Sequence, residues 1–174
     1  FQDASDCLKE QDLKIVERAK EIGKAIIVVI NKTDLLNREE LYELKKNISN
    51  EPALNGLPCC FISAMENKGF RSLFDQIYRV LKNANTNIST NKLNKILSQA
   101  KEAKSIPYKG KFKPKIRYIH QGGKNPHILT LHGNSLEKLE GSYQRFLTNF
   151  FHKKLNLSGI TIKLKFINSK NPYN

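Results

Sequence analysis

Two short polar motifs hold the residues best suited to chemistry, and each motif follows an apolar run. Asn31-Lys32-Thr33-Asp34 comes directly after AIIVVI, and Ser63-Ala64-Met65 comes after CCFI. A short carboxylate such as that of Asp34 can accept two hydrogen bonds from guanine, from the ring N–H and the exocyclic amino group, whereas adenine offers no such pair of donors at that edge. Charge-assisted bonds of this kind contribute about 1.5–3 kcal/mol each. The pattern therefore predicts a guanine-binding site with Asp34 as the specificity residue.

The other motif residues are expected to support this site. The stem of Lys32 can cover the flat face of the base, and Asn31 can tie the turn to neighbouring loops. Ala64 is small, so a backbone N–H can approach a base carbonyl oxygen closely. A polar turn in which Asp34 caps the next element is the alternative, but two such motifs at successive strand ends favour binding. The predicted guanine-binding residues are Asn31, Lys32, Thr33, Asp34, Ser63, Ala64 and Met65.

Alternating helices and strands are predicted for residues 1–85, because apolar periodicity changes repeatedly along this half. The continuous β-branched run 25–30 indicates a strand buried on both faces, as in a parallel α/β sheet, and such sheets bind ligands at the carboxyl ends of their strands. Asn37 and Glu40 resemble a capping box that opens a helix. Helices are predicted over residues 9–23, 38–48 and 70–81, and a second buried strand over 59–63.

The second half, residues 86–174, follows a linker rich in Asn and Thr at 83–91. Strands are predicted at 115–120, 127–132 and 161–166, and helices around 93–100 and 136–155. The order α-β-β-α-β indicates a small α+β domain with helices on one face of a three-stranded sheet. Gly122, Gly123, Asn125 and Pro126 form a turn, which is expected to be a simple connection rather than a contact with RNA.

The net positive charge of the chain comes entirely from the second half. Residues 1–85 carry 13 Lys and Arg against 13 Asp and Glu, whereas residues 86–174 carry 17 against 3, a net charge of 17 − 3 = +14. This asymmetry indicates a domain that faces a polyanion, with phosphate contacts that position it on folded RNA. An acidic protein surface is the other possible partner. The RNA-binding candidates are Lys109, Lys111, Lys113, Lys115, Arg117, Lys163 and Lys165.

Several other classes of protein are disfavoured by the sequence. There is no run of 18 apolar residues and no secretory signal, so a cytoplasmic protein is expected, with no membrane partner. The three cysteines, Cys7, Cys59 and Cys60, lack C-x-x-C spacing and are interpreted as reduced core residues. The four histidines form no ligand pattern with them, so no metal site is predicted.

The chain resembles the Der family, also called EngA, over nearly its whole length. The resemblance is carried by DAS, EQDLKI and NKTDLL in the first half, by KIRYIHQGGKNPHILTLHGN and SYQRFLTNFF in the second, and by the terminal NPY. In that family two GTPase domains precede a KH-like domain. The resemblance implies a chain with one α/β part and one α+β part. Residues 1–85 would be the C-terminal half of the second P-loop GTPase domain, which has a Ras-like, Rossmann-type fold. Residues 86–174 would be the KH-like domain.

The same resemblance implies a function. Der-like GTPases bind GTP and GDP with Mg²⁺ and act in assembly of the large (50S) ribosomal subunit, so ribosomal RNA and the upstream GTPase domains are the expected partners, and DNA is not. A stand-alone basic RNA-binding module with a non-functional GTPase remnant is the alternative.

The sequence also departs from the family pattern. Thr33 stands where the family usually has Trp, and no G-x-x-x-x-G-K-[ST] or D-x-x-G motif occurs, so the phosphate-binding and Mg²⁺-binding residues are absent. No catalytic residue is assigned, and this fragment alone is not expected to hydrolyse GTP. The second half has no G-x-x-G loop, so reading of four bases as in ordinary KH domains is not expected.

Overall fold

The computed structural model describes residues 2–4, 9–107, 113–124 and 126–168, which fall into two compact units. Unit 1 comprises residues 1–85 together with 157–161, and unit 2 comprises residues 86–156 together with 162–174. The segment 157–161, which the sequence analysis placed in the second half, therefore packs with unit 1. Its backbone joins that unit directly, since the N–H of Ile26 donates to the carbonyl of Gly159 at 2.9 Å and the N–H of Gly159 donates to the carbonyl of Gly56 at 2.9 Å.

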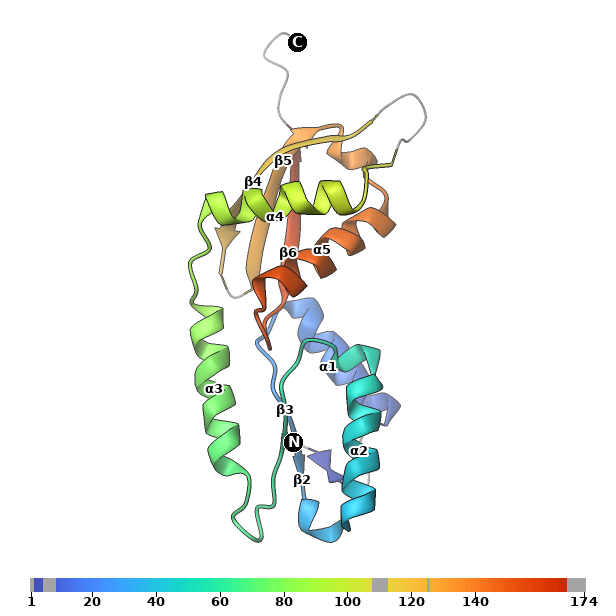
Figure 1. Cartoon of the computed structure of the whole chain (residues 1–174), viewed down its shortest axis with the longest axis vertical. Helices are drawn as coiled ribbons and strands as arrows, with labels where there is room; N and C mark the ends of the chain where they lie inside the picture. Colours follow the sequence, from blue (N-terminus) through green and yellow to red (C-terminus); the bar gives the residue numbers. More distant parts are fainter. Residues whose placement is uncertain (1, 5–8, 108–112, 125, 169–174) are drawn as a thin grey trace. The chain divides into compact units, whose positions relative to one another are not determined.

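Unit 1 is built on a parallel three-stranded sheet with strand order β1-β2-β3. The predicted buried strand is β2, and it lies in the centre of the sheet between the two other strands. Figure 1 shows α1 and α2 on one side of β2 and β3, and α3 on the other side. The elements are β1 (Gln2–Asp3), α1 (Glu10–Ile22), β2 (Val28–Asn31), the 3-10 turn η2 (Thr33–Leu35), α2 (Arg38–Asn50), the 3-10 turn η3 (Pro52–Leu54), β3 (Cys59–Phe61) and α3 (Phe70–Ala84).

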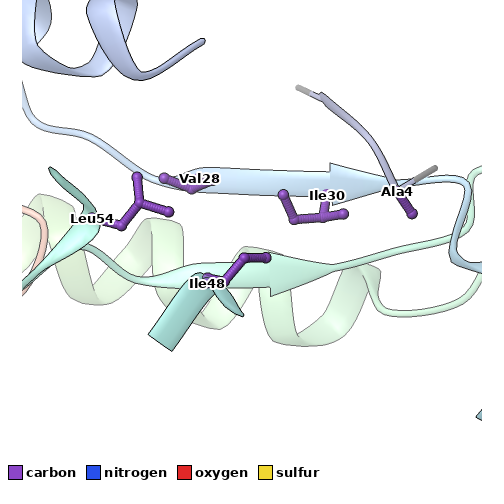
Figure 2. Packing of buried hydrophobic residues seen from close by; sticks show 5 residues of the cluster. All are labelled: Ala4, Val28, Ile30, Ile48 and Leu54. Carbon is purple, nitrogen blue, oxygen red and sulfur yellow. The ribbon is translucent and has the colours of Figure 1, made fainter. Parts of the chain in front are cut away.

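Both faces of this sheet are buried, which explains why the strand sequence does not alternate between apolar and polar residues. On one face, Val28 and Ile30 of β2 pack with Ala4, Ile48 and Leu54, and Figure 2 shows these five side chains along the strand. On the other face, a second cluster is formed by Val29, Cys60, Ile62 and Leu73, the last from α3. The sheet is thereby fixed between two helical layers, as the predicted α/β class requires.

Local signals in the sequence set the helix boundaries. Asn37 accepts hydrogen bonds from the backbone N–H groups of Glu39 at 2.9 Å and Glu40 at 3.0 Å, and the Glu40 carboxylate accepts from the N–H of Asn37 at 2.8 Å. This is the predicted capping box of α2. Gly23 ends α1 in the left-handed region with φ 79°, a conformation that glycine adopts without steric cost.

Unit 2 has the predicted order α-β-β-α-β. Strands β4 and β5 are antiparallel, β5 and β6 are parallel, and β5 is central. Figure 1 shows α4 and α5 on the same side of this sheet, where they cover buried residues such as Ile119, Leu129 and Leu131. The elements are α4 (Thr90–Ala103), β4 (Lys115–Gly123), β5 (His127–Asn134), the 3-10 turn η4 (Leu136–Lys138), α5 (Gly141–Leu155) and β6 (Ile162–Asn168).

The single helix predicted over residues 136–155 is wrong at its start. A 3-10 turn ends at Lys138, Leu139 is extended with ψ 123°, and α5 begins at Gly141. Leu136 and Leu139 are nevertheless buried, so the apolar stripe that suggested one helix consists of core residues from two elements. Apolar spacing alone cannot detect such an interruption, because both elements bury side chains on the same side.

The two described cysteines, Cys59 and Cys60, are expected to react slowly with iodoacetamide in the native protein. Burial raises the pKa of the Cys59 thiol from 9.0 to about 11, with a smaller effect of Cys60, and burial also raises the pKa of Cys60. Because the thiolate is the nucleophile, the shift at Cys59 lowers its reactive fraction at neutral pH by about 100-fold. Peptide mapping after alkylation, with and without urea, measures this. Native Cys59 reacting as fast as unfolded Cys59 would contradict the expectation.

Candidate functional site

The two polar motifs lie at the same edge of the unit 1 sheet. Strands β2 and β3 are parallel, with Ile30 opposite Phe61, so both strands end toward the same side. Hydrogen bonds continue beyond the paired strands: the N–H of Ile62 donates to the carbonyl of Ile30 at 2.8 Å, and the N–H of Thr33 donates to the carbonyl of Ile62 at 3.2 Å. The Thr33 hydroxyl donates to the same Ile62 carbonyl at 2.9 Å. Thr33 therefore fastens one loop to the other.

Side-chain hydrogen bonds join the two motifs a second time. The Ser63 hydroxyl donates to Oδ1 of Asp34, and the same hydroxyl oxygen accepts from the N–H of Glu66 at 3.1 Å. Ser63 is only 1% exposed, so its hydroxyl is held in place by burial as well as by bonding. Oδ2 of Asp34 accepts no hydrogen bond from the described residues, and Asp34 itself is exposed. The carboxylate is thus oriented through one oxygen while the other can accept bonds from a ligand.

Asn31 ties the turn to the neighbouring loop, as the sequence indicates. Its Oδ1 accepts a hydrogen bond from the backbone N–H of Ala64 at 3.0 Å. From the sequence, a backbone N–H near the small Ala64 is expected to approach a base carbonyl oxygen. The two roles compete, so a bound base would have to share this N–H with Asn31 or take it over. Met65 projects into solvent, with 91% of its surface exposed.

Lys32 has an unusual backbone conformation and a defined partner. Its φ of 60° lies in the left-handed region, and its ammonium is 2.7 Å from Oδ2 of Asp3 on β1. The hydrogen bond to Asp3, and then the charge of Asp3, raise the pKa of Lys32. Both side chains are about half exposed, at 52% and 46%, so this ion pair contributes little to stability. The ion pair restrains the position of the Lys32 side chain within the motif.

The second loop is closed by a tight turn before α3. Ser63 and Lys68 form an antiparallel bridge with N–H to carbonyl distances of 3.1 and 3.0 Å in the two directions. Gly69 follows with φ 83°, and a Cβ at this position would lie 2.3 Å from the carbonyl oxygen of Phe61. Only glycine fits here, because both the conformation and the close backbone approach exclude a side chain.

The described basic candidates of unit 2 lie on or next to two strands of its sheet. Lys113, Lys115 and Arg117 are exposed before and on β4, and Lys163 and Lys165 are exposed on β6. These strands form the two edges of the sheet, with β5 between them. Lys109 and Lys111 lie outside the described residues, as do Asn125 of the predicted turn and Cys7. Gly122 and Gly123 were wrongly assigned to that turn, because β4 continues to Gly123, which lies opposite Ile128 of β5.

Three rings on the uncovered face of the unit 2 sheet were missed by the sequence analysis. The rings of Tyr118 and His132 are stacked with centroids 4.5 Å apart and planes at 5°, and His120 stacks on His132 at 5.0 Å. Burial, followed by the nearby His120, lowers the pKa of His132. Cross-strand registry creates this cluster, and registry is not visible in single-strand patterns.

No group of three or more His, Cys, Asp or Glu side chains among the described residues could hold a metal ion. In the described part of the chain, no helix is long and apolar enough to cross a membrane.

The fold defines part of a Rossmann-type α/β domain and a KH-like α+β domain. Residues 2–83 match the family model for the elongation factor Tu GTP binding domain, and residues 87–166 match the model for the KH-domain-like region of EngA bacterial GTPase enzymes, C-terminal. The chain belongs to the Der (EngA) family of GTPases.

Individual relatives agree with this assignment. The chain is 37% identical over 172 residues to GTPase Der of Neisseria meningitidis serogroup C, and the alignment covers 98% of this chain and 36% of the relative. GTPase Der of Thioalkalivibrio sulfidiphilus is also 37% identical over 172 residues, and that of Thiobacillus denitrificans is 38% identical over 174 residues, each with 98% of this chain and 37% of the relative covered. The chain therefore spans just over a third of the length of these curated relatives.

Replacing Gly69 with Ala is expected to lower the free energy of unfolding by at least about 1–2 kcal/mol, because the new Cβ adds a backbone clash to left-handed strain. Gly141 is the matched control: it opens α5, and a Cβ there meets nothing within 4 Å. Gly141→Ala should stay within about 0.5 kcal/mol of the parent. Chemical denaturation followed by circular dichroism compares the two. Equal effects would refute the role given to Gly69.

Proposed function

We propose that unit 1 recognises the guanine base of GTP and GDP, and that the protein to which this chain belongs is a GTP-hydrolysing enzyme. The observation that carries the proposal is the double connection between the loops. Asn31 accepts from the N–H of Ala64, and Ser63 donates to Asp34. These bonds fix the carboxylate that must match two donors of guanine before any ligand arrives, so less conformational entropy is lost on binding.

The chemistry expected of the site follows from this arrangement. Oδ2 of Asp34 would accept a hydrogen bond from guanine, and the stem of Lys32, whose ammonium pairs with Asp3, would lie along the face of the base. Ala64 and Met65 of the second loop would complete the contacts with the base. Adenine would present no matching pair of donors, so Asp34 would remain underbonded. Mg²⁺ would accompany the phosphates of the nucleotide, whereas the residues of this sequence account for base recognition alone.

For unit 2 we propose binding to ribosomal RNA of the large (50S) subunit, in support of its assembly, in the cytoplasm. Support comes from the match to the KH-like region of bacterial GTPases and from the net charge of +14 carried by residues 86–174. The exposed cations on β4 and β6 would contact phosphates, which position a domain on folded RNA without reading its sequence. Nucleotide state in the GTPase domains would then control how this unit is presented.

Asp34→Asn in the intact parent protein is expected to reverse base preference. The amide can no longer accept both guanine donors, so affinity for GDP should fall at least about 100-fold, from two bonds of roughly 1.5 kcal/mol each, while affinity for xanthosine diphosphate rises. Asp75→Asn, within α3 and outside both motifs, is the charge-matched control and should leave both affinities unchanged. Competition binding with GDP, XDP and ADP measures this. Unchanged GDP preference would refute the assignment, and no binding of any nucleotide by the parent would favour a non-functional remnant.

Neutralising Lys113, Lys115 and Arg117 together is expected to weaken binding to 50S subunits and to reduce its salt dependence. Each lost phosphate contact should lower the slope of log affinity against log salt by about 0.7–0.9. Neutralising Lys14, Arg18 and Lys46 of unit 1, which already pair with carboxylates, changes the net charge equally and should not alter the slope. Co-sedimentation of each triple variant with 50S subunits across a salt series measures the two slopes. Equal losses in both triple variants would show a general charge effect.

A further inference from the structure

We propose that the edge of the unit 2 sheet at Tyr118 is a stacking site for one unpaired RNA base, with Lys115 and Arg117 holding the flanking phosphates. The inference rests on the proposed RNA-binding function of unit 2 and adds to it the part of the RNA that is bound. It requires an aromatic ring open to a ligand, cations next to that ring, and no competing negative charge.

A β-bulge leaves the ring of Tyr118 and its neighbouring cation in the chain both exposed. In a regular strand neighbouring side chains alternate between faces, so Arg117 and Tyr118 would point in opposite directions. The register between β4 and β5 shifts between Ile116 and Tyr118, with Ile116 opposite Gly133 and Tyr118 opposite His132. As a result Ile116 and Ile119 are buried while the two residues between them are both exposed. Bulges are common at sheet edges and beside functional sites, where they redirect side chains.

The ring of Tyr118 is held flat from one side and open on the other. Its inner side stacks on His132 of the central strand at 4.5 Å with a 5° angle between the planes. Strand β4 is an edge strand of the sheet formed by the described residues, so no further strand covers the outer side. Tyr118 is 45% exposed despite the stack. A preformed aromatic surface of this kind can receive a base without ordering a flexible side chain first.

The charges around the ring favour a polyanion. Lys115 and Arg117 precede Tyr118 on β4, and the register places Lys165 opposite Thr130, in the same row as His120. The three acidic residues of the second half are Glu102, Glu137 and Glu140, none of which lies on a strand of this sheet. A ligand with alternating flat rings and phosphates matches this combination of one exposed ring and adjacent cations.

An unpaired base is favoured over a duplex. Bases in a helix are already stacked on their neighbours on both faces, whereas bases in loops, bulges and ends can leave the stack and pack on aromatic side chains. The site has one open ring and is expected to accept any of the four bases, since every base has a stacking face. Unit 2 would thus bind an irregular element of folded RNA and would not select a particular base sequence.

The test compares two single-stranded probes binding to the complete 174-residue chain, by fluorescence anisotropy at low salt. One probe is a short oligoadenylate, and the other is the same ribose-phosphate backbone without bases. The parent chain should bind the oligoadenylate more tightly than the abasic probe. Tyr118→Ala should lower affinity for the oligoadenylate at least about fivefold, the lower limit for losing one base–aromatic stack, and leave the abasic probe unaffected.

Three controls make the outcome decisive. Tyr118→Phe keeps the ring and should retain the base preference, and Tyr78→Ala on α3, 74% exposed, should change nothing. Circular dichroism confirms that each variant is folded. Equal affinity of the parent for both probes, or for a polyglutamate of equal charge, would overturn the stacking site while leaving charge-based binding in place. Binding of neither RNA probe would overturn the RNA-binding function itself.

Discussion

The parallel pairing of β2 with β3 is the constraint on which the proposed guanine site depends. It brings residues 31–34 and 63–65 to one edge of the sheet, although they are about thirty positions apart in the chain. Hydrogen bonds made by Thr33, Asn31 and Ser63 then join the two loops, so each loop restrains the other. The pairing is itself fixed by burial of both sheet faces, since a slip of one residue would exchange Val29 with Val28 and Ile30 between the two apolar clusters.

Most of unit 1 could be predicted because its signals are local. The β-branched run marks β2, the capping box marks the start of α2, and the two motifs mark the ends of strands. The hydrogen bonds within the site could not be predicted from local pattern, because they join residues distant in sequence. The pairing of Lys32 with Asp3 requires β1 beside β2, and the use of the Ala64 N–H by Asn31 requires the two loops at their actual separation.

In unit 2, apolar periodicity predicts the order of the helices and strands but not the interruptions within them. The order of elements was predicted correctly, but the interruption at Leu139 and the bulge before Tyr118 were not, because each leaves the count of apolar residues almost unchanged. The bulge has the larger consequence. It leaves Arg117 and Tyr118 both exposed, so the basic stripe on β4 also includes an aromatic ring. The return of residues 157–161 to unit 1 also depends on long-range contacts.

The central claim is that the loops at residues 31–34 and 63–65 form one site for guanine. Titration of the isotope-labelled 174-residue chain with guanosine, followed by ¹H–¹⁵N correlation spectra, tests it most directly, because it needs neither phosphates nor Mg²⁺. Guanosine is expected to cause saturable shifts of the backbone N–H signals of Asp34 and of Ser63 to Met65, and adenosine is expected to cause none. Equal shifts with both nucleosides, or shifts that leave the two loops unaffected, would contradict it.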